Sequence, residues 1–233
     1  MYILAGASAF FLIRGRLWQR CPTRLLLLWY VGESLWIYPH YLAYFNEIAG
    51  GPRHAYRHLV DSSLDWGQDL PGLKQWLDKY HLNKKEDAYL CYFGTADLDN
   101  YGVLASRLPY QCSNDPAEPG PYKGGVYCIS ATKLETVYDT PKGNWSALYE
   151  DTYRKLLPEM QRPQALAGTT VSPQERETRK IRVNLFEQLR FARLCAYLRQ
   201  REPEEEIGYS ILIYRLTDAD LNEAFFGKPA ELE

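Results

Sequence analysis

An apolar run from Leu25 to Phe45 constrains the fold of this chain more than any other feature. As a helix, its 21 residues would extend roughly 30 Å, which matches the hydrocarbon core of a bilayer. Aromatic residues gather near its end, as in the interfacial belt of membrane helices. Glu33 would be costly against lipid, and we expect Pro39 to kink the helix or to end its membrane part. The run predicts a transmembrane helix at residues 25–45.

A shorter apolar run at residues 2–13 has only twelve of the about 20 residues that a spanning helix needs. It indicates a truncated helix, so we expect the chain to be the tail of a longer polytopic protein, or its start codon to be misassigned. Residues 14–24, between the two runs, contain four Arg and no acidic residue, which predicts a cytoplasmic loop. The sequence thus predicts a membrane segment at residues 1–49 and an extracytoplasmic domain at residues 50–233.

A soluble protein in which both runs are buried core helices is the alternative, because short apolar runs do not distinguish the two. A signal peptide does not fit, since no charge precedes the first run. Charge also separates the two parts of the chain. Residues 1–45 hold four of the 27 basic and one of the 29 acidic residues, which leaves a net charge of −5 on the rest. This balance argues against a nucleic-acid-binding protein.

The residues after Gly50-Gly51-Pro52 predict an α/β domain, with a mixed sheet of about four or five strands flanked by helices. Strands are expected at residues 57–61, 88–93, 125–134 and 207–216. Helices are expected at residues 69–80, 144–160 and 176–201, with a linker at 161–175. Residues 57–93 therefore form a βαβ candidate. In the helix at residues 69–80, the apolar residues that share one face are Leu70, Leu73, Trp76 and Leu77.

The five cysteines leave two interpretations open. If the domain is exported, Cys112 and Cys128 are a possible disulfide, and Cys91 is another candidate partner. Alternatively, Cys91, Cys128 and Cys195 are small buried hydrophobic residues, which is the commoner situation. No CxxC motif occurs, and the four His show no spacing typical of metal ligands beyond His54 and His58. We therefore predict no structural metal site.

The densest group of polar residues is VDSSLDWGQDL at residues 60–70. Three Asp recur every four residues between an expected strand and an expected helix, a junction where α/β folds place ligand sites. Three carboxylates would repel an anion unless a metal ion intervened. The pattern therefore indicates a divalent cation, or sugar hydroxyls held by Asp and Gln with the ring stacked on Trp. The candidate substrate-binding residues of this segment are Asp61, Asp65, Trp66, Gln68 and Asp69.

A purely structural role is the competing interpretation of this segment, because capping alone explains Asp at a helix start. Under it, Asp61 ends the strand, the two later Asp cap the helix and Trp66 packs. Tyr92 and Tyr101 are further binding candidates, since their loop follows the strand at residues 88–93 and would face the same site. A tyrosine-rich turn is the commoner explanation for these two residues.

Six segments, spread over nearly the whole chain, carry a resemblance to a known family. They are residues 38–47 with Gly50-Gly51, 59–62, 64–70, 92–94, 129–132 and 207–211. The most specific element is DWGQDL, which comes shortly after PHYLAYFNE. Together, these segments resemble the C-terminal part of bacterial polytopic glycosyltransferases of the protein-O-mannosyltransferase-like class (family 39, GT-C architecture).

The resemblance implies an inner-membrane enzyme that moves a sugar from a polyprenyl-phosphate donor to a glycan or protein acceptor on the outer face. It also implies a catalytic Asp in the first extracytoplasmic loop of the full-length enzyme, so no catalytic residue carries over to this chain. We expect the tail to position substrate and to be inactive alone. The alternatives are a non-catalytic, membrane-tethered interaction module and a metal-dependent hydrolase built on the three Asp.

Overall fold

The fold of the chain is known from a computed structural model. It describes residues 16–108, 119–161 and 172–232, together with Gly6, Phe10 and Arg14. The chain divides into two compact units, Met1–Tyr44 and Phe45–Glu233. The N-terminal unit contains helix α2 (Leu17–Trp36) and the short 3-10 helix η1 (Tyr41–Ala43). Large apolar side chains of α2 are exposed along Leu25–Val31.

Helix α2 differs from the transmembrane helix expected at residues 25–45. It begins earlier, so residues 17–24 of the predicted cytoplasmic loop are helical, and it ends at Trp36. Pro39 follows closely, and proline cannot continue a helix because it lacks the backbone N–H. In the part of the chain that the structure describes, no helix has both the length and the apolar character needed to cross a membrane. Most of the helix expected at residues 2–13 lies outside the described residues.

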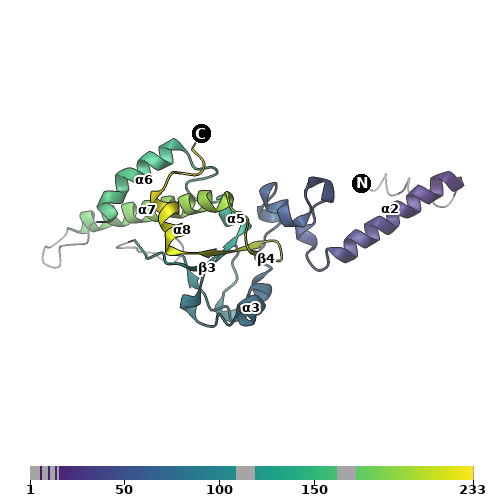
Figure 1. The fold of residues 1–233 in the computed structure, drawn as a ribbon, viewed down its shortest axis with the longest axis horizontal. Coiled ribbons are helices and arrows are strands. Elements are labelled where there is room, and N and C mark those ends of the chain that lie inside the picture. The colour runs from purple at the N-terminus through teal and green to yellow at the C-terminus, as the bar shows by residue number, and fades with distance from the viewer. Residues whose placement is uncertain are drawn as a thin grey trace. The chain divides into compact units, whose positions relative to one another are not determined.

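The C-terminal unit is an α/β domain built on a mixed five-stranded sheet in the order β2-β1-β3-β5-β4 (Figure 1). Its strands are β1 (Ala88–Cys91), β2 (Ser106–Arg107), β3 (Gly125–Ser130), β4 (Glu205–Ile207) and β5 (Ile211–Leu216). Strand β1 runs parallel to both β2 and β3, whereas β5 runs antiparallel to β3 and β4. The predicted mixed sheet flanked by helices is confirmed.

Helices lie on both faces of this sheet. They are α3 (Leu70–Lys79), α5 (Ala131–Leu134), α6 (Ala147–Met160), α7 (Pro173–Arg199) and α8 (Asp218–Phe226). Figure 1 shows α3 on one side of the sheet, and α6, α7 and α8 on the other. The helices expected at residues 69–80, 144–160 and 176–201 are thus confirmed with small shifts at their ends. Most of the expected linker at residues 161–175 lies outside the described part of the chain.

The alternation of side chains along the strands places one set of them in a core cluster against α3. On β3, Val126 and Cys128 pack into the cluster formed with α3, as do Ile211 and Ile213 on β5. The residues of α3 in this cluster are the four predicted ones, Leu70, Leu73, Trp76 and Leu77. A second cluster joins α6 to α7, and its buried members include Trp145, Tyr153, Phe186 and Leu189.

The described cysteines of the sheet and of α7 fit the interpretation that they are small buried hydrophobic residues rather than disulfide partners. Cys91, Cys128 and Cys195 are buried free thiols, which confirms that they act as small hydrophobic residues. Burial raises the pKa of Cys128 to about 12, so its thiol is protonated and unreactive. Cys112, the other half of the possible disulfide, lies outside the described residues.

One predicted strand is wrong, and another is shorter than expected. Residues 57–61 form no strand: they run from the last residue of the 3-10 helix η3 (Pro52–Arg57) to the first residue of η4 (Asp61–Ser63), so the βαβ unit is not formed. Asp61 has a positive φ of 61°, which is incompatible with an extended strand. Of the strand expected at residues 207–216, Ile211–Leu216 form β5, while Ile207 is the last residue of β4. Gly208 and Tyr209 both have positive φ and turn the chain between β4 and β5.

Candidate functional site

The candidate site lies where the carboxyl ends of β1 and β3 meet the start of β5. Tyr92 and Phe93 follow β1, Ser130 ends β3 and Ser210 precedes β5. The backbone N–H of Phe93 donates to the Ser130 hydroxyl at 2.9 Å, which joins the first two strand ends. The N–H of Ala131 donates to the Ser210 carbonyl at 2.8 Å, which joins the second to the third. Ligand sites of α/β folds commonly form at such an edge.

The loop of residues 61–69 is fastened to this edge. The backbone N–H of Asp61 donates to the Thr132 hydroxyl at 3.0 Å, and the Tyr92 hydroxyl donates to the Gly67 carbonyl at 2.7 Å. Gly67 has a φ of 77°, and a Cβ at this position would overlap the Tyr92 hydroxyl. Glycine is therefore required here for two reasons, its backbone conformation and the close approach of Tyr92. Tyr92 thus lies beside the loop, as the sequence predicts.

Hydrogen bonds within the loop fix the orientation of Trp66. Its indole N–H donates to the Ser62 carbonyl at 3.1 Å, while its backbone N–H donates to Gln68 Oε1 at 2.8 Å. The side-chain amide of Gln68 also donates to the Leu64 carbonyl at 3.1 Å. Gln68 is therefore occupied in holding the loop together. Trp66 presents a ring of fixed direction that is 66% exposed.

Asp65 is a buried carboxyl group with unequal oxygens. The residue is only 1% exposed, and its Oδ1 accepts the backbone N–H of Gly67 at 2.9 Å. Within the described residues, its Oδ2 accepts no hydrogen bond. Burial raises the pKa of Asp65 to about 6, although the Gly67 N–H and the Ser130 hydroxyl favour the ionised form. The nearby carboxylates of Asp69 and Asp61 raise this pKa further.

Asp69 stands at the start of α3, but its side chain does not cap the helix. Its Oδ2 accepts hydrogen bonds from the Ser210 hydroxyl at 2.6 Å and from Gln68 Nε2 at 3.0 Å. The residue is 7% exposed, so this carboxylate belongs to the interior of the domain. The capping interpretation is therefore wrong for Asp69, and its carboxylate instead connects the loop to the turn before β5.

Asp61 is the carboxylate of the loop that faces outward. Its Oδ2 accepts a hydrogen bond of 2.5 Å from the hydroxyl of Tyr138, and this bond raises the pKa of that hydroxyl. Tyr138 in turn stacks on Phe93, with the ring centres 5.6 Å apart and the planes nearly parallel. The exposed surface of the site thus combines the Asp61 carboxylate, the Tyr138 hydroxyl and the Trp66 ring.

The three carboxylates of the loop do not converge on one point where they could bind a metal ion together. Asp61, Asp65 and Asp69 each bind different partners, and among residues 16–108, 119–161 and 172–232 no three His, Cys, Asp or Glu are placed to hold a metal ion. Tyr101 lies in the 3-10 helix η6 (Asp99–Tyr101) and is largely exposed. Burial raises the pKa of Tyr92 to about 12, and Asp65 and Tyr101 add to that shift.

Four residues of the site were not identified individually from the sequence: Ser130, Thr132, Tyr138 and Ser210. Three of them lie in the segments 129–132 and 207–211, which the resemblance had already selected. Their place in these two segments is the sequence feature that could have identified the three residues. Tyr138 lies in none of them, and its role follows only from its hydrogen bond to Asp61.

Comparisons with known proteins return no match. No protein-family model matches the chain. No curated protein matches it, and no solved structure does. Its function is therefore argued from the geometry of the site and the chemistry of its residues.

Proposed function

We propose that the C-terminal domain positions a sugar-bearing substrate for a membrane glycosyltransferase similar to the protein O-mannosyltransferases. One observation supports this proposal most directly. Segments that lie far apart in the sequence, and that each belong to the family resemblance, meet at one edge of the sheet. The loop of residues 61–69 contacts Tyr92, Thr132 and Ser210, each from a different segment of that resemblance. The proposed substrate is a polyprenyl-phosphate sugar, with a glycan or a protein as acceptor.

The chemistry of the exposed surface supports a sugar ligand. A pyranose ring has apolar faces that stack on aromatic rings, and its hydroxyls donate to carboxylates. Trp66 supplies an exposed ring held in one direction, and Asp61 supplies an outward carboxylate held by Tyr138. Asp65, Gln68 and Asp69 bond within the domain and hold the loop in place. Binding therefore falls to Trp66 and Asp61, and positioning to the other three.

The proposed location is the inner membrane, with the C-terminal domain on the extracytoplasmic side. Helix α2 exposes consecutive large apolar side chains over Leu25–Val31, each between 43% and 69% exposed. Four Arg lie within residues 14–24. Such a combination binds apolar acyl chains and anionic headgroups. We propose that α2 holds the chain at the lipid bilayer, which co-flotation with phosphatidylglycerol vesicles tests directly.

Binding of a short-chain polyprenyl-phosphate mannose to the full chain in detergent micelles tests the proposed function. Isothermal titration should give a weaker affinity for Trp66→Ala by about tenfold, because an aromatic contact contributes up to about 1.5 kcal/mol. Leu148→Ala is the matched control, since Leu148 on α6 is 70% exposed and distant in sequence from the loop. Its affinity should equal that of the unmodified chain.

Two results would contradict the proposal. One is equal affinity of Trp66→Ala and Leu148→Ala, which would mean that the exposed ring does not contact the sugar. The other is no binding by the unmodified chain to either the mannose probe or the corresponding glucose probe. Asp65 is unsuited to this test because it is buried, so its substitution changes stability together with binding.

A further inference from the structure

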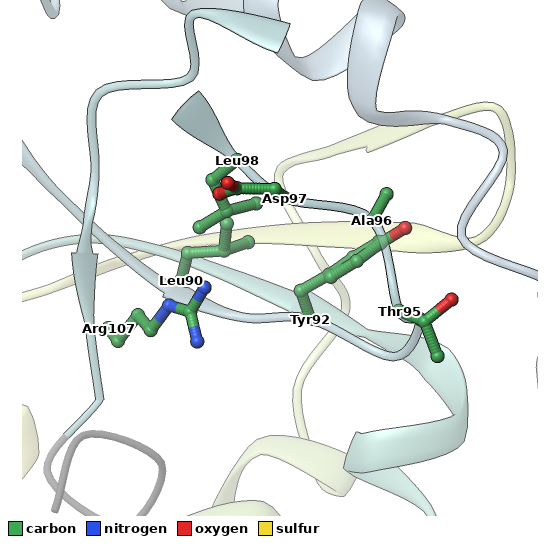
Figure 2. A pocket seen from close by; sticks show the side chains of 8 residues that line it. Leu90, Tyr92, Thr95, Ala96, Asp97, Leu98 and Arg107 are labelled. Atoms are coloured by element: carbon green, nitrogen blue, oxygen red, sulfur yellow. The ribbon is translucent and has the colours of Figure 1, made fainter. Parts of the chain in front are cut away.

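An open cavity of about 610 Å³ lies at the carboxyl end of β1, beside the candidate sugar site (Figure 2). Its charged side chains are those of Asp97 and Arg107, which Figure 2 shows on either side of Leu90 in this view. No side-chain nitrogen or oxygen of the residues that line it is buried without a hydrogen-bond partner. The cavity therefore contains no buried group that a ligand would have to satisfy.

Strand β4 does carry a buried group of this kind, the carboxyl group of Glu206. The side chain is 9% exposed, and within the described residues its Oε2 accepts no hydrogen bond. Its Oε1 lies 3.7 Å from Nε of Arg53, which is too far for a hydrogen bond. The Arg53 side chain is itself 70% exposed, so water screens its charge. An ionised Glu206 would therefore be only weakly compensated.

The charged groups around Glu206 come mainly from the 3-10 helix η3. Burial raises the pKa of this carboxyl group to about 7. The positive charges that lower the pKa belong to Arg53, His54 and Arg57, all of η3. The carboxylate of Glu202, from the segment before β4, raises it further. Burial thus outweighs the attraction of the nearby cations.

Helix η3 is attached to the domain by its buried residues, which are Pro52, Ala55 and Tyr56. On the surface, Arg57 pairs with Glu202 at 2.6 Å, and exposed pairs of this kind contribute little to stability. A segment of six residues such as η3 opens locally at a lower free energy than the centre of a sheet does. A modest change in the energy of Glu206 can therefore change how often η3 opens.

We propose that Glu206 is a pH-sensitive switch, which keeps η3 on β4 while its carboxyl group is neutral and favours opening of η3 when the group ionises. Opening brings water to the carboxylate, so its pKa returns toward the ordinary value of 4.5. The pKa is thus higher in the closed state than in the open state. The closed state is favoured most below about pH 4.5, and this advantage is lost as the pH rises through about 7.

The place of η3 in the chain gives its opening a consequence. Only residues 58–60 separate η3 from η4, where the loop of residues 61–69 begins. Opening of η3 therefore lengthens the mobile connection between the N-terminal unit and this loop. The switch does not depend on the proposed sugar site, because Glu206 and Arg53 lie outside the loop. A failure of sugar binding would leave the proposed switch untouched.

Amide hydrogen exchange of the full chain in detergent micelles tests the switch. The backbone N–H groups of His54, His58 and Leu59 donate to carbonyls of Gly51 and Ala55, so their exchange reports the opening of η3. After correction for intrinsic exchange rates, their protection should fall by at least about tenfold between about pH 5.5 and pH 8.5. The amides of the central strand β3 report unfolding of the sheet, and their protection should fall less.

Glu206→Gln keeps the shape of the side chain and is neutral at every pH. Its η3 amides should have the same protection, within about twofold, at both pH values. Glu202→Gln is the matched control, because it removes a carboxylate that is 66% exposed from the same part of the chain. This variant should keep the pH dependence of the unmodified chain.

Four results would overturn the proposal. The first is protection of η3 that stays constant or increases as the pH rises, and the second is an equal fall for the β3 amides, which would indicate global unfolding. The third is a pH dependence that persists in Glu206→Gln, which would assign it to His54 and His58. The fourth is loss of the pH dependence in Glu202→Gln as well, which would mean that burial of Glu206 is not its cause.

Discussion

The side-chain hydroxyl of Ser210 donates a 2.6 Å hydrogen bond to Oδ2 of Asp69, across 141 residues of sequence. Both residues are buried, so the bond is shielded from water. It joins the turn between β4 and β5 to the start of α3 and to the loop that carries Trp66. The position of the exposed Trp66 ring therefore depends on an interior polar contact.

Replacing Ser210 with Ala should lower the free energy of unfolding by about 1.5–3 kcal/mol, because a buried hydrogen bond to a charged group has about that value. Urea unfolding of the two chains, followed by circular dichroism, measures the difference. Ser62→Ala removes an exposed hydroxyl from the same loop and should change stability by less than about 0.5 kcal/mol. Equal stability of the two variants would show that the bond contributes nothing.

Gly208 lies next to the same carboxylate. It has a φ of 58°, and a Cβ at this position would overlap the carboxylate of Asp69. Gly208→Ala should cost about 1–2 kcal/mol for the backbone conformation and about 1–3 kcal/mol more for the overlap. Gly143→Ala isolates the first effect, because Gly143 has a φ of 72° and a Cβ there would meet no atom within 4 Å. The same loss of stability in both variants would mean that Asp69 yields without cost.

The raised pKa of Asp65 predicts a pH-dependent stability. Its pKa is about 6 in the folded protein, and burial is the main cause. A carboxyl group with a raised pKa favours the folded state below about pH 4, and that contribution is lost as the pH rises through about 6. Asp65→Asn stays neutral at every pH, so its stability relative to the unmodified chain should increase by up to about 3 kcal/mol between pH 4 and pH 7. A constant difference over this range would contradict the prediction.

Local patterns were sufficient to predict most of the domain. The apolar face of α3 and the β-branched residues of β5 have the periodicity of their structures, and both were found. The strand at residues 57–61 failed because short apolar stretches do not specify backbone conformation, and Asp61 takes a positive φ. The split of residues 207–216 was indicated only by Gly208, a residue that permits a turn without requiring one.

The candidate site was only half predictable. The loop of residues 61–69 was singled out because it precedes the helix expected at residues 69–80, and Tyr92 because it lies at the end of the strand expected at residues 88–93. Thr132 and Tyr138 are 71 and 77 residues from the Asp61 that they bind. Contacts over such separations depend on strand order, which periodicity does not determine. The roles of the three Asp also depend on burial, since one faces outward and two face inward.

A buried ion pair between α6 and α7 should be essential for the second core cluster. Arg193 is buried, and its Nε donates to Glu150 Oε2 at 2.9 Å. Glu150→Ala should lower the free energy of unfolding by about 3–5 kcal/mol, because it leaves a buried guanidinium uncompensated. Glu159→Ala breaks the pair with Arg182, which joins the same two helices on the surface, and should cost less than about 1 kcal/mol. Thermal or urea unfolding measures the loss of stability in each variant. Similar losses in Glu150→Ala and Glu159→Ala would show that the buried ion pair contributes no more than the exposed one.

The outward carboxylate of Asp61 should depend on Tyr138 for its direction. Tyr138→Phe keeps the ring that stacks on Phe93 but removes the hydroxyl that donates to Asp61 at 2.5 Å. We expect this variant to bind the polyprenyl-phosphate mannose probe several-fold more weakly, because the carboxylate must then be ordered when the sugar binds. Tyr101→Phe removes a hydroxyl from an exposed tyrosine of η6, outside the loop of residues 61–69, and it should bind the probe as before. Equal weakening by both variants would indicate that Tyr101 contacts the sugar, and no weakening by Tyr138→Phe would remove Asp61 from the binding surface.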